Sequence, residues 1–204
     1  MPAKLPAIPA GLDHNLGATG QAFNTEHPYF ANTKLKTLQN VAQYASYNKE
    51  YRKEYFDVKT GGYVVVHKKA DKKDKAKNVE VGKILAKNSY RVQVNKHEQN
   101  KGRQPEYIIN NRLSDLKIPE TKSDYKVFIN AFEAARKQDL KECVIYLKNQ
   151  KYKITELLEG LKQAFFNKKA MKRVVVVYRK KAKTITRDYL KSRKAEKILR
   201  KLFR

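Results

Sequence analysis

Hydrophobic residues recur at helical spacing in the first third of the chain. Within residues 33–56 they lie three or four positions apart, at Leu35, Leu38, Val41, Ala42 and Ala45. This spacing is typical of one face of an amphipathic helix, so we predict a single helix over the segment. Residues 1–30 show weak periodicity and carry four of the six prolines and three of the eight glycines, which predicts an extended arm.

From Gly61 onward, runs of β-branched residues alternate with stretches of helical spacing. Each change of period predicts a change of element. The predicted elements are a strand at 63–67, a helix at 70–88, a strand at 90–97, and two strands at 105–110 and 112–119 around a tight turn at Asn110-Asn111. They are followed by a helix at 123–138, a strand at 143–148, a helix at 154–172, a strand at 173–180, and a short strand or strand-to-turn segment at 182–190. This order predicts a mixed α/β domain, and 204 residues are enough for one core.

The same pattern divides the chain into three parts. Residues 1–56 form the arm and the amphipathic helix, residues 57–190 form the main domain, and residues 191–204 form a basic C-terminal helix. Apolar residues such as Leu199 and Leu202 recur at helical spacing among the lysines and arginines of this last segment. The segment therefore either packs on the domain through its apolar stripe or contacts phosphates through its charges.

Charge narrows the choice of partner. Lys and Arg number 46 against 20 Asp and Glu, which gives a formal net charge of +26. Nucleic acid is the polyanion that fits best, because phosphate contacts are made chiefly by Lys and Arg. A membrane surface is the main rival, but the sequence has no apolar run of 18 residues and no apolar core of a signal peptide. We therefore expect a protein that acts in the cytoplasm, with no stable membrane insertion.

Three acidic residues and a lysine are spaced so that they can meet. Glu80 lies on a predicted helix, Glu106 follows a proline at the start of a predicted strand, and Asp115 and Lys117 lie on the next strand. Because side chains alternate along a strand, Asp115 and Lys117 point to the same face, with Glu106 one hairpin partner away. The spacing predicts that all four converge.

Such a cluster suits the hydrolysis of a phosphodiester by a bound divalent cation. The cation offsets charge on the phosphate and lowers the pKa of the attacking water. Mg²⁺ and Mn²⁺ prefer oxygen ligands and keep several waters, so two or three carboxylates suffice. We expect Glu80, Glu106 and Asp115 to hold Mg²⁺ or Mn²⁺, and Lys117 to orient the water or offset charge.

These residues resemble the motif of the PD-(D/E)xK nucleases: a helix Glu, then Pro-Asp, then (Asp/Glu)-x-Lys across a β-hairpin. The closer resemblance is to nuclease toxin domains of bacterial contact-dependent inhibition and related polymorphic toxin systems, in which a helix like NVEVGKILAKNSY and a strand like YRVQV precede the hairpin. The resemblance spans about residues 61–190. It implies a restriction-endonuclease-like fold, with a mixed central sheet flanked by helices and an N-terminal helical arm.

The resemblance also implies a role for each matching residue. Glu80 is the helix carboxylate that touches the metal or its water, Glu106 the central ligand, Asp115 the second ligand and Lys117 the charge-stabilising residue. Gln138 corresponds to a polar position that faces the active site. The resemblance further implies a toxin effector that cleaves tRNA or DNA, is delivered by a secretion system to a target cell, and binds an acidic immunity protein.

One departure from the motif supports a second hypothesis. This chain has Pro105-Glu106 where the family usually has Pro-Asp, and the extra methylene shifts the ligand oxygen. The alternative is a non-catalytic basic nucleic-acid-binding protein with a degenerate nuclease fold, from a phage or mobile element. A third hypothesis is a membrane-surface protein that binds through its basic C-terminal helix.

Other residues are candidates for contact with nucleic acid. His67 ends the apolar run YVVVH beside two lysines, and Arg112 and Arg187 lie near predicted strand ends. The 13 tyrosines either stack on unpaired bases or pack in the core, and the sequence leaves both open. The single Cys143 lies in an apolar run, so we expect a buried, inert thiol.

Overall fold

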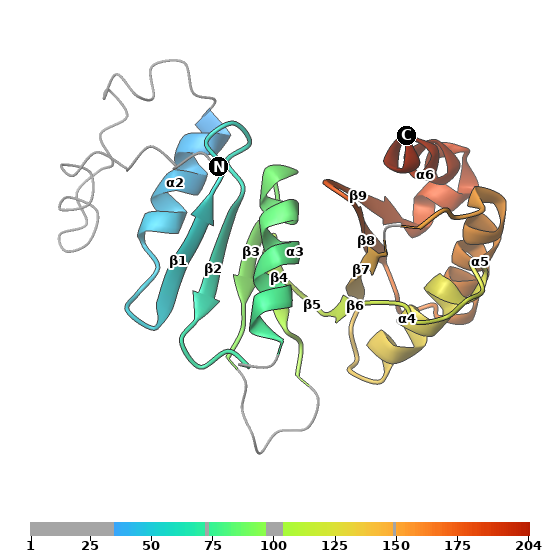
Figure 1. Cartoon of the computed structure of the whole chain (residues 1–204), viewed down its shortest axis with the longest axis horizontal. Helices are drawn as coiled ribbons and strands as arrows, with labels where there is room; N and C mark the ends of the chain where they lie inside the picture. The colour runs from blue at the N-terminus through green and yellow to red at the C-terminus, as the bar shows by residue number, and fades with distance from the viewer. Residues whose placement is uncertain (1–34, 72–73, 97–103, 149) are drawn as a thin grey trace.

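The computed structural model describes residues 35–71, 74–96, 104–148 and 150–204 (Figure 1). The predicted arm at 1–30 lies outside these residues. The helices are α2 (Leu35–Ala45), α3 (Lys75–Lys87), α4 (Lys126–Arg136), α5 (Ile154–Asn167) and α6 (Lys194–Phe203), with a 3-10 turn at Arg187–Lys191. The strands are β1 (Tyr51–Phe56), β2 (Tyr63–His67), β3 (Arg91–Val94), β4 (Tyr107–Ile109), β5 (Arg112–Ser114), β6 (Leu116–Lys117), β7 (Glu142–Leu147), β8 (Arg173–Tyr178) and β9 (Lys181–Thr186).

The strands form two mixed sheets, which confirms the predicted α/β class. In the first, the order is β1-β2-β3-β4-β5, and only β2 and β3 are parallel, connected by α3. In the second, the order is β6-β7-β8-β9, with β6, β7 and β8 parallel and β9 antiparallel. The helices lie between and outside the sheets (Figure 1).

The single helix predicted over 33–56 is wrong in its second half. The helix ends at Ala45, and residues 51–56 form β1, which pairs antiparallel with β2. The apolar periodicity also stops at Ala45, and the tyrosines and phenylalanine that follow are residues that fit a pleated, half-buried surface. β1 thus precedes residue 57, where we placed the start of the main domain, and pairs with a strand that follows it.

A core shared by both sheets fixes their relative position. It contains residues of α3 together with Val64, Val92, Val144 and Val175, which come from β2, β3, β7 and β8. Gly82 lets α3 approach the first sheet closely, because a Cβ there would lie 3.3 Å from a Val64 methyl carbon. α3 therefore packs against both sheets.

The outer face of the second sheet is covered by α4, α5 and α6, which form a separate core cluster with β7 and β8. Ala195, Leu199 and Leu202 of α6 are buried there. The apolar stripe of the C-terminal helix therefore packs on the domain, as one of the two alternatives predicted. None of the helices in the described segments is both long and apolar enough to cross a membrane.

The chain changes sheets at Asp115. The predicted hairpin is confirmed, since Asn110 and Asn111 both have positive φ, 48° and 66°, as a tight two-residue turn requires. The strand predicted at 112–119 is interrupted: β5 ends at Ser114 in the first sheet and β6 begins at Leu116 in the second. Asp115 thus lies at the junction of the two sheets, and its backbone carbonyl accepts a hydrogen bond from the N–H of Val144 in β7 at 2.9 Å.

Candidate active site

A cavity of about 280 Å³ opens at this junction, and we call it the acidic cavity. Its walls come from the start of α3, the end of β3, the start of β4, the β5–β6 junction and the end of α4. The charged and polar side chains that line it are Asp71, Asp74, Asn78, Asn95, Lys96, Gln104, Glu106, Asp115, Lys117 and Gln138.

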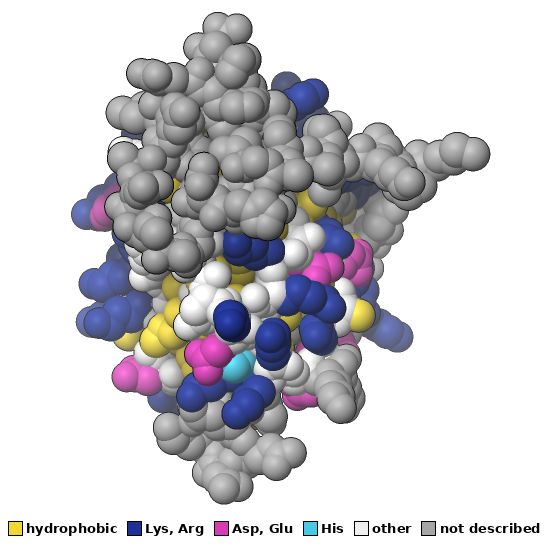
Figure 2. Space-filling view, turned by 90° about the vertical axis from the view of Figure 1, so that its left-hand side faces the viewer, with side chains coloured by type: hydrophobic (Ala, Val, Ile, Leu, Met, Phe, Trp, Pro, Cys, Tyr) yellow, Lys and Arg dark blue, Asp and Glu magenta, His cyan; other side chains and the backbone are white. Residues whose placement is uncertain are grey.

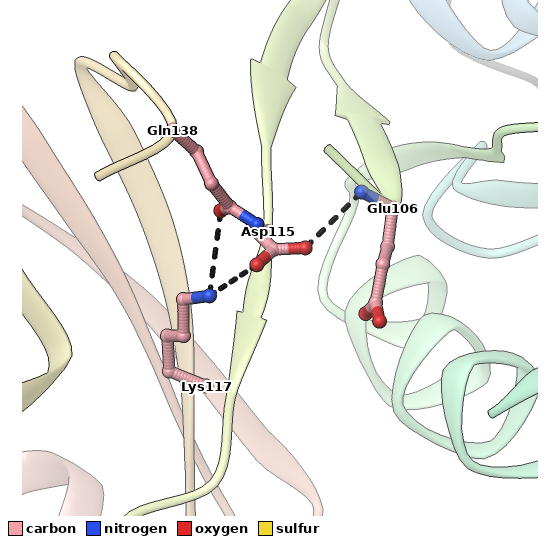
Figure 3. Close-up of polar contacts among 4 residues, drawn as sticks. All are labelled: Glu106, Asp115, Lys117 and Gln138. Carbon is pink, nitrogen blue, oxygen red and sulfur yellow. Dashed lines mark hydrogen bonds and ion pairs between the residues drawn. The ribbon is translucent and has the colours of Figure 1, made fainter. Parts of the chain in front are cut away.

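Asp115 is the centre of the hydrogen-bond network in this cavity (Figure 3). Its side chain is buried, its Oδ1 accepts a hydrogen bond from the backbone N–H of Glu106 at 3.1 Å, and its Oδ2 forms an ion pair with Lys117 Nζ. Lys117 Nζ also donates a hydrogen bond to Gln138 Oε1 at 3.4 Å. The structure therefore brings together Glu106, Asp115, Lys117 and Gln138, although Gln138 is 21 residues from Lys117 in sequence.

Strand geometry explains this convergence. Tyr107 of β4 pairs with Ser114 of β5, so the next position outward places Glu106 opposite Asp115. Asp115 and Lys117 are two residues apart and point to the same side, as alternation along an extended chain requires. Gln138 reaches the cavity because α4 ends beside β6 and β7.

The pKa of Glu106 is raised from its ordinary value to about 7. Burial is the largest cause, and the negative charges of Asp115 and Asp74 add to it, while Lys117 and a hydrogen bond from the Asn78 side chain act in the opposite direction. The Glu106 carboxylate points toward α3 (Figure 3). Near neutral pH this carboxyl is therefore easily protonated, and a cation placed in the cavity would favour its charged form.

Glu80 does not join the other predicted residues. It is exposed on α3, pairs with Lys77 at 3.0 Å and does not line the acidic cavity. The helix face toward the cavity carries Asn78, and two positions further along an α-helix the side chain has turned by about 200°. The structure therefore places Glu80 away from Glu106 and Asp115.

The acidic groups that the start of α3 does bring to the cavity are Asp74, which stands at the N-cap position without a side-chain capping hydrogen bond, and Asp71 before it. We missed both in the sequence, where they stand in the charged run ADKKDKAKN. Asp74 is one helical turn before Asn78, so a correct assignment of the buried face would have found it. Within the described parts of the chain, no three His, Cys, Asp or Glu side chains are grouped closely enough to hold a metal ion.

The remaining predicted residues lie outside the acidic cavity. His67 is buried at the end of β2 and lines a neighbouring cavity. Arg112 is exposed on β5 and lies close enough to Glu142 to lower the pKa of that carboxyl. Arg187 donates to the carbonyl of Lys168 at 2.8 Å and to that of Met171, so it holds the turn after α5.

Cys143 is buried and free, as predicted. Burial raises the pKa of its thiol far above the ordinary value, so the reactive thiolate is not formed at neutral pH. Nucleophilic cysteine chemistry therefore has no place in this site.

The fold and the cavity together define a mixed α/β protein with a carboxylate-lysine site at the junction of two sheets. Comparison with known protein families and with curated proteins finds no match. Among solved structures, the chain is similar to one described as a CdiA-CT/CdiI toxin and immunity complex from Burkholderia pseudomallei, with a TM-score of 0.44 and 15% identity. The similarity covers 56% of this chain and 85% of that chain. Similarity at this level does not establish a shared function.

Proposed function

We propose that the protein is a metal-dependent nuclease that hydrolyses phosphodiester bonds in nucleic acid. The observation that carries the proposal is the meeting of Glu106, Asp115, Lys117 and Gln138 in one cavity of a chain with a net charge of +26. The charge favours a polyanionic substrate, and the cavity combines carboxylates with an ammonium group. Together these are the groups that phosphodiester hydrolysis needs.

The carboxylates of the acidic cavity are the class of oxygen donor that Mg²⁺ and Mn²⁺ prefer. Glu106 and Asp115 would hold the cation, with water as the remaining ligands. Asp74 lines the same cavity from the start of α3, but it is not grouped with them as a third ligand. The raised pKa of Glu106 supports this fit, because neighbouring carboxylates that repel one another are stabilised by a cation. When bound, such a cation supplies Lewis-acid stabilisation of the phosphate and a water of lowered pKa.

The protein side chains position and neutralise the reacting groups. Lys117 is held between Asp115 and Gln138, so its ammonium has a fixed location beside the carboxylates. From there it can offset negative charge on a phosphate oxygen as the charge develops. Gln138 acts on the reaction through Lys117, as a positioning residue.

A role as a toxin effector is part of the proposal and rests on the motif resemblance of residues 61–190. In that role the substrate is tRNA or DNA in the cytoplasm of a target cell, reached through a secretion system. The expected partner is an immunity protein with an acidic face, because a chain of net charge +26 selects a partner of opposite charge.

The second candidate function is a basic nucleic-acid-binding protein without catalysis. The ion pair between Asp115 and Lys117 favours it, because the lysine already neutralises one of the two expected ligands. The Glu at position 106 and the placement of Glu80 outside the cavity also favour it. Both functions require nucleic-acid binding with a steep dependence on salt, and only the first requires cleavage.

Cleavage assays separate the two. Wild type and Asp115→Ala are incubated with total RNA and with plasmid DNA, in Mg²⁺, in Mn²⁺ and in EDTA. Wild type should cleave one substrate with metal only, and Asp115→Ala should lose cleavage while it keeps binding. Asp188→Ala is the matched control, since Asp188 has a side chain 83% exposed and lies outside the cavity. Cleavage that persists in EDTA, or in Asp115→Ala, rejects the metal-dependent nuclease.

A further inference from the structure

A second cavity, of about 440 Å³, adjoins the acidic cavity, and we call it the tyrosine cavity. Its lining includes Tyr51, His67, Lys69 and Glu50, and it shares Asn95, Lys96, Gln104 and Pro105 with the acidic cavity. Because the two cavities have these wall residues in common, a ligand chain can occupy both at once. The volume lies in the range of sites that enclose small organic groups.

Tyr51 and His67 form an aromatic wall in this cavity. Their ring centroids are 5.0 Å apart with the planes nearly perpendicular. The side-chain N–H of Gln93 donates a hydrogen bond to the Tyr51 hydroxyl at 2.9 Å, and the Tyr47 hydroxyl donates one to Gln93 Oε1 at 3.2 Å. Tyr51 is therefore held in place on a hydrogen-bonded support and loses little further freedom when a ligand binds.

His67 offers a hydrogen-bond donor to a ligand. Its Nδ1 accepts a hydrogen bond from the backbone N–H of Lys69 at 3.0 Å, so the proton of the neutral ring lies on Nε2. Within the described segments no hydrogen-bond partner of Nε2 is found, and the atom is not among the fully buried unpartnered ones. His67 is buried and its ring packs nearly perpendicular to that of Tyr51, so it supports the Tyr51 ring, and Nε2 is its remaining donor.

A third cavity, of about 570 Å³, continues from the tyrosine cavity and shares Tyr51 with it. We call it the basic cavity because five cationic side chains line it, namely Lys49, Arg52, Lys53, Lys68 and Lys75. Lysine and arginine side chains gather on the face of the molecule on the β1 side (Figure 2). Along this path the lining changes from acidic, through aromatic, to basic.

We propose that the tyrosine cavity binds an unpaired nucleotide of single-stranded nucleic acid, with the base against the half-exposed ring of Tyr51. This inference rests on the proposed function, because that function places the cleaved phosphate beside Lys117 in the acidic cavity. The nucleic-acid strand then runs from the basic cavity, where lysines and an arginine bind phosphates, through the tyrosine cavity to the acidic cavity. A base inside a duplex is stacked on its neighbours and cannot place its face against a side chain in a cavity. The substrate class is therefore single-stranded DNA or RNA, or an unpaired segment of a folded RNA.

Binding measured in EDTA tests the proposal without cleavage. Fluorescein-labelled 12-nucleotide strands of one sequence, as DNA and as RNA, are compared with the DNA duplex of that sequence by anisotropy. Tyr51→Ala should weaken binding to a single strand about 5- to 100-fold, the size expected for loss of one base stack, and should change duplex binding less than about twofold. The DNA and RNA arms show which backbone is preferred.

Matched variants separate the contribution of the Tyr51 ring to binding from that of the lysine charges. Tyr51→Phe keeps the ring and should bind within about threefold of wild type, and Tyr125→Ala, on an exposed tyrosine that lines none of the three cavities, should not change binding. Tyr51→Leu replaces Tyr51→Ala if the latter fails to fold by circular dichroism. Loss of the ring should leave the salt dependence unchanged, whereas Lys69→Gln should lower the slope of log K against log salt by about 0.7.

The outcomes separate this inference from the nuclease proposal. Weakened single-strand binding by Tyr51→Ala supports the tyrosine cavity even if wild type never cleaves. Binding by Tyr51→Ala and Tyr51→Leu within about twofold of wild type, or an equal loss on duplex and single strand, overturns it even if wild type cleaves in Mg²⁺.

Discussion

Glu106, which is half-buried in the acidic cavity, and Glu142, which is buried at the start of β7, differ in the charges that surround them. Glu106 and Glu142 both have a pKa raised to about 7, and burial is the largest cause in each. Around Glu106 the further charges include Asp115 and Asp74, which raise its pKa more. Around Glu142 they are Arg173, at 3.0 Å, and Arg112, which lower it.

The charge of Glu142 is thus offset by guanidinium groups, whereas in the acidic cavity Lys117 pairs with Asp115 and the carboxylates still outnumber that ammonium. The Glu142 region pairs its buried charge with a guanidinium across β7 and β8, so it contributes to the fold. The acidic cavity has several carboxylates and accepts charge from outside, so it is suited to a ligand. Four substitutions test this contrast between the two regions.

Lys117→Met should affect activity far more than stability. Removing the ammonium that is held by Asp115 and Gln138 should lower cleavage by about 100-fold or more, because charge on the phosphate is then no longer offset. Lys77→Met is the control, since Lys77 pairs with exposed Glu80 and lines none of the acidic cavity. Initial cleavage rates in Mg²⁺ are measured for Lys117→Met and Lys77→Met. Equal rates for the two variants would show that Lys117 has no part in the mechanism.

Arg173→Met should instead affect stability far more than activity. It leaves Glu142, whose side chain is 5% exposed, without its partner, and should lower the free energy of unfolding by about 3 kcal/mol in urea titrations. Arg136→Met removes an ion pair to the more exposed Glu133 and should cost less than about 0.5 kcal/mol. Glu142→Leu combined with Arg173→Met should recover most of the loss, because no unpaired charge stays buried. If the free energy of unfolding fell no more in Arg173→Met than in Arg136→Met, Arg173 would not stabilise the fold by pairing with Glu142.

Glu106→Gln should change how stability depends on pH. The folded pKa of Glu106, about 7, lies above its ordinary 4.5, so the folded state binds the proton more tightly. This contribution to stability is present below pH 4.5 and is lost as the pH rises through 7. The free energy of unfolding of Glu106→Gln should therefore rise relative to that of wild type as the pH rises, by on the order of 2 kcal/mol at pH 8. Urea unfolding from pH 5 to pH 8 measures the gain, and a constant difference between the two proteins would refute it.

Glu80→Gln should have the smallest effect. Glu80 is exposed and pairs with Lys77, so stability should change by less than about 0.5 kcal/mol and cleavage by less than twofold. Asp74→Asn, which removes the carboxylate that α3 does bring to the cavity, should lower cleavage measurably in the same assay. If Glu80→Gln lowered cleavage more than Asp74→Asn did, Glu80 rather than Asp74 would belong to the active site.

Much of the site could be predicted because it depends on local geometry. Asp115 and Lys117 share a side because strand side chains alternate, and the Asn110-Asn111 turn sets the register that places Glu106 opposite Asp115. The orientation of α3 could not be predicted, because Asp74 and Glu80 both stand among lysines and only packing decides which face is buried. Arg187, a predicted nucleic-acid contact, also donates to the backbone carbonyls of Lys168 and Met171, and a sequence gives no sign of such contacts.

The amino-acid sequence by itself determined the α/β class, the charge of +26 and most of the strands and helices, since these depend on the period of apolar residues and on composition. Only the tertiary structure decided that residues 51–56 form a strand, that the chain changes sheets at Asp115, and that Tyr51 and His67 adjoin the acidic cavity. The reason is physical: strand pairing and cavities arise between segments far apart in the chain, and no local pattern of residues encodes which distant segment will be the neighbour.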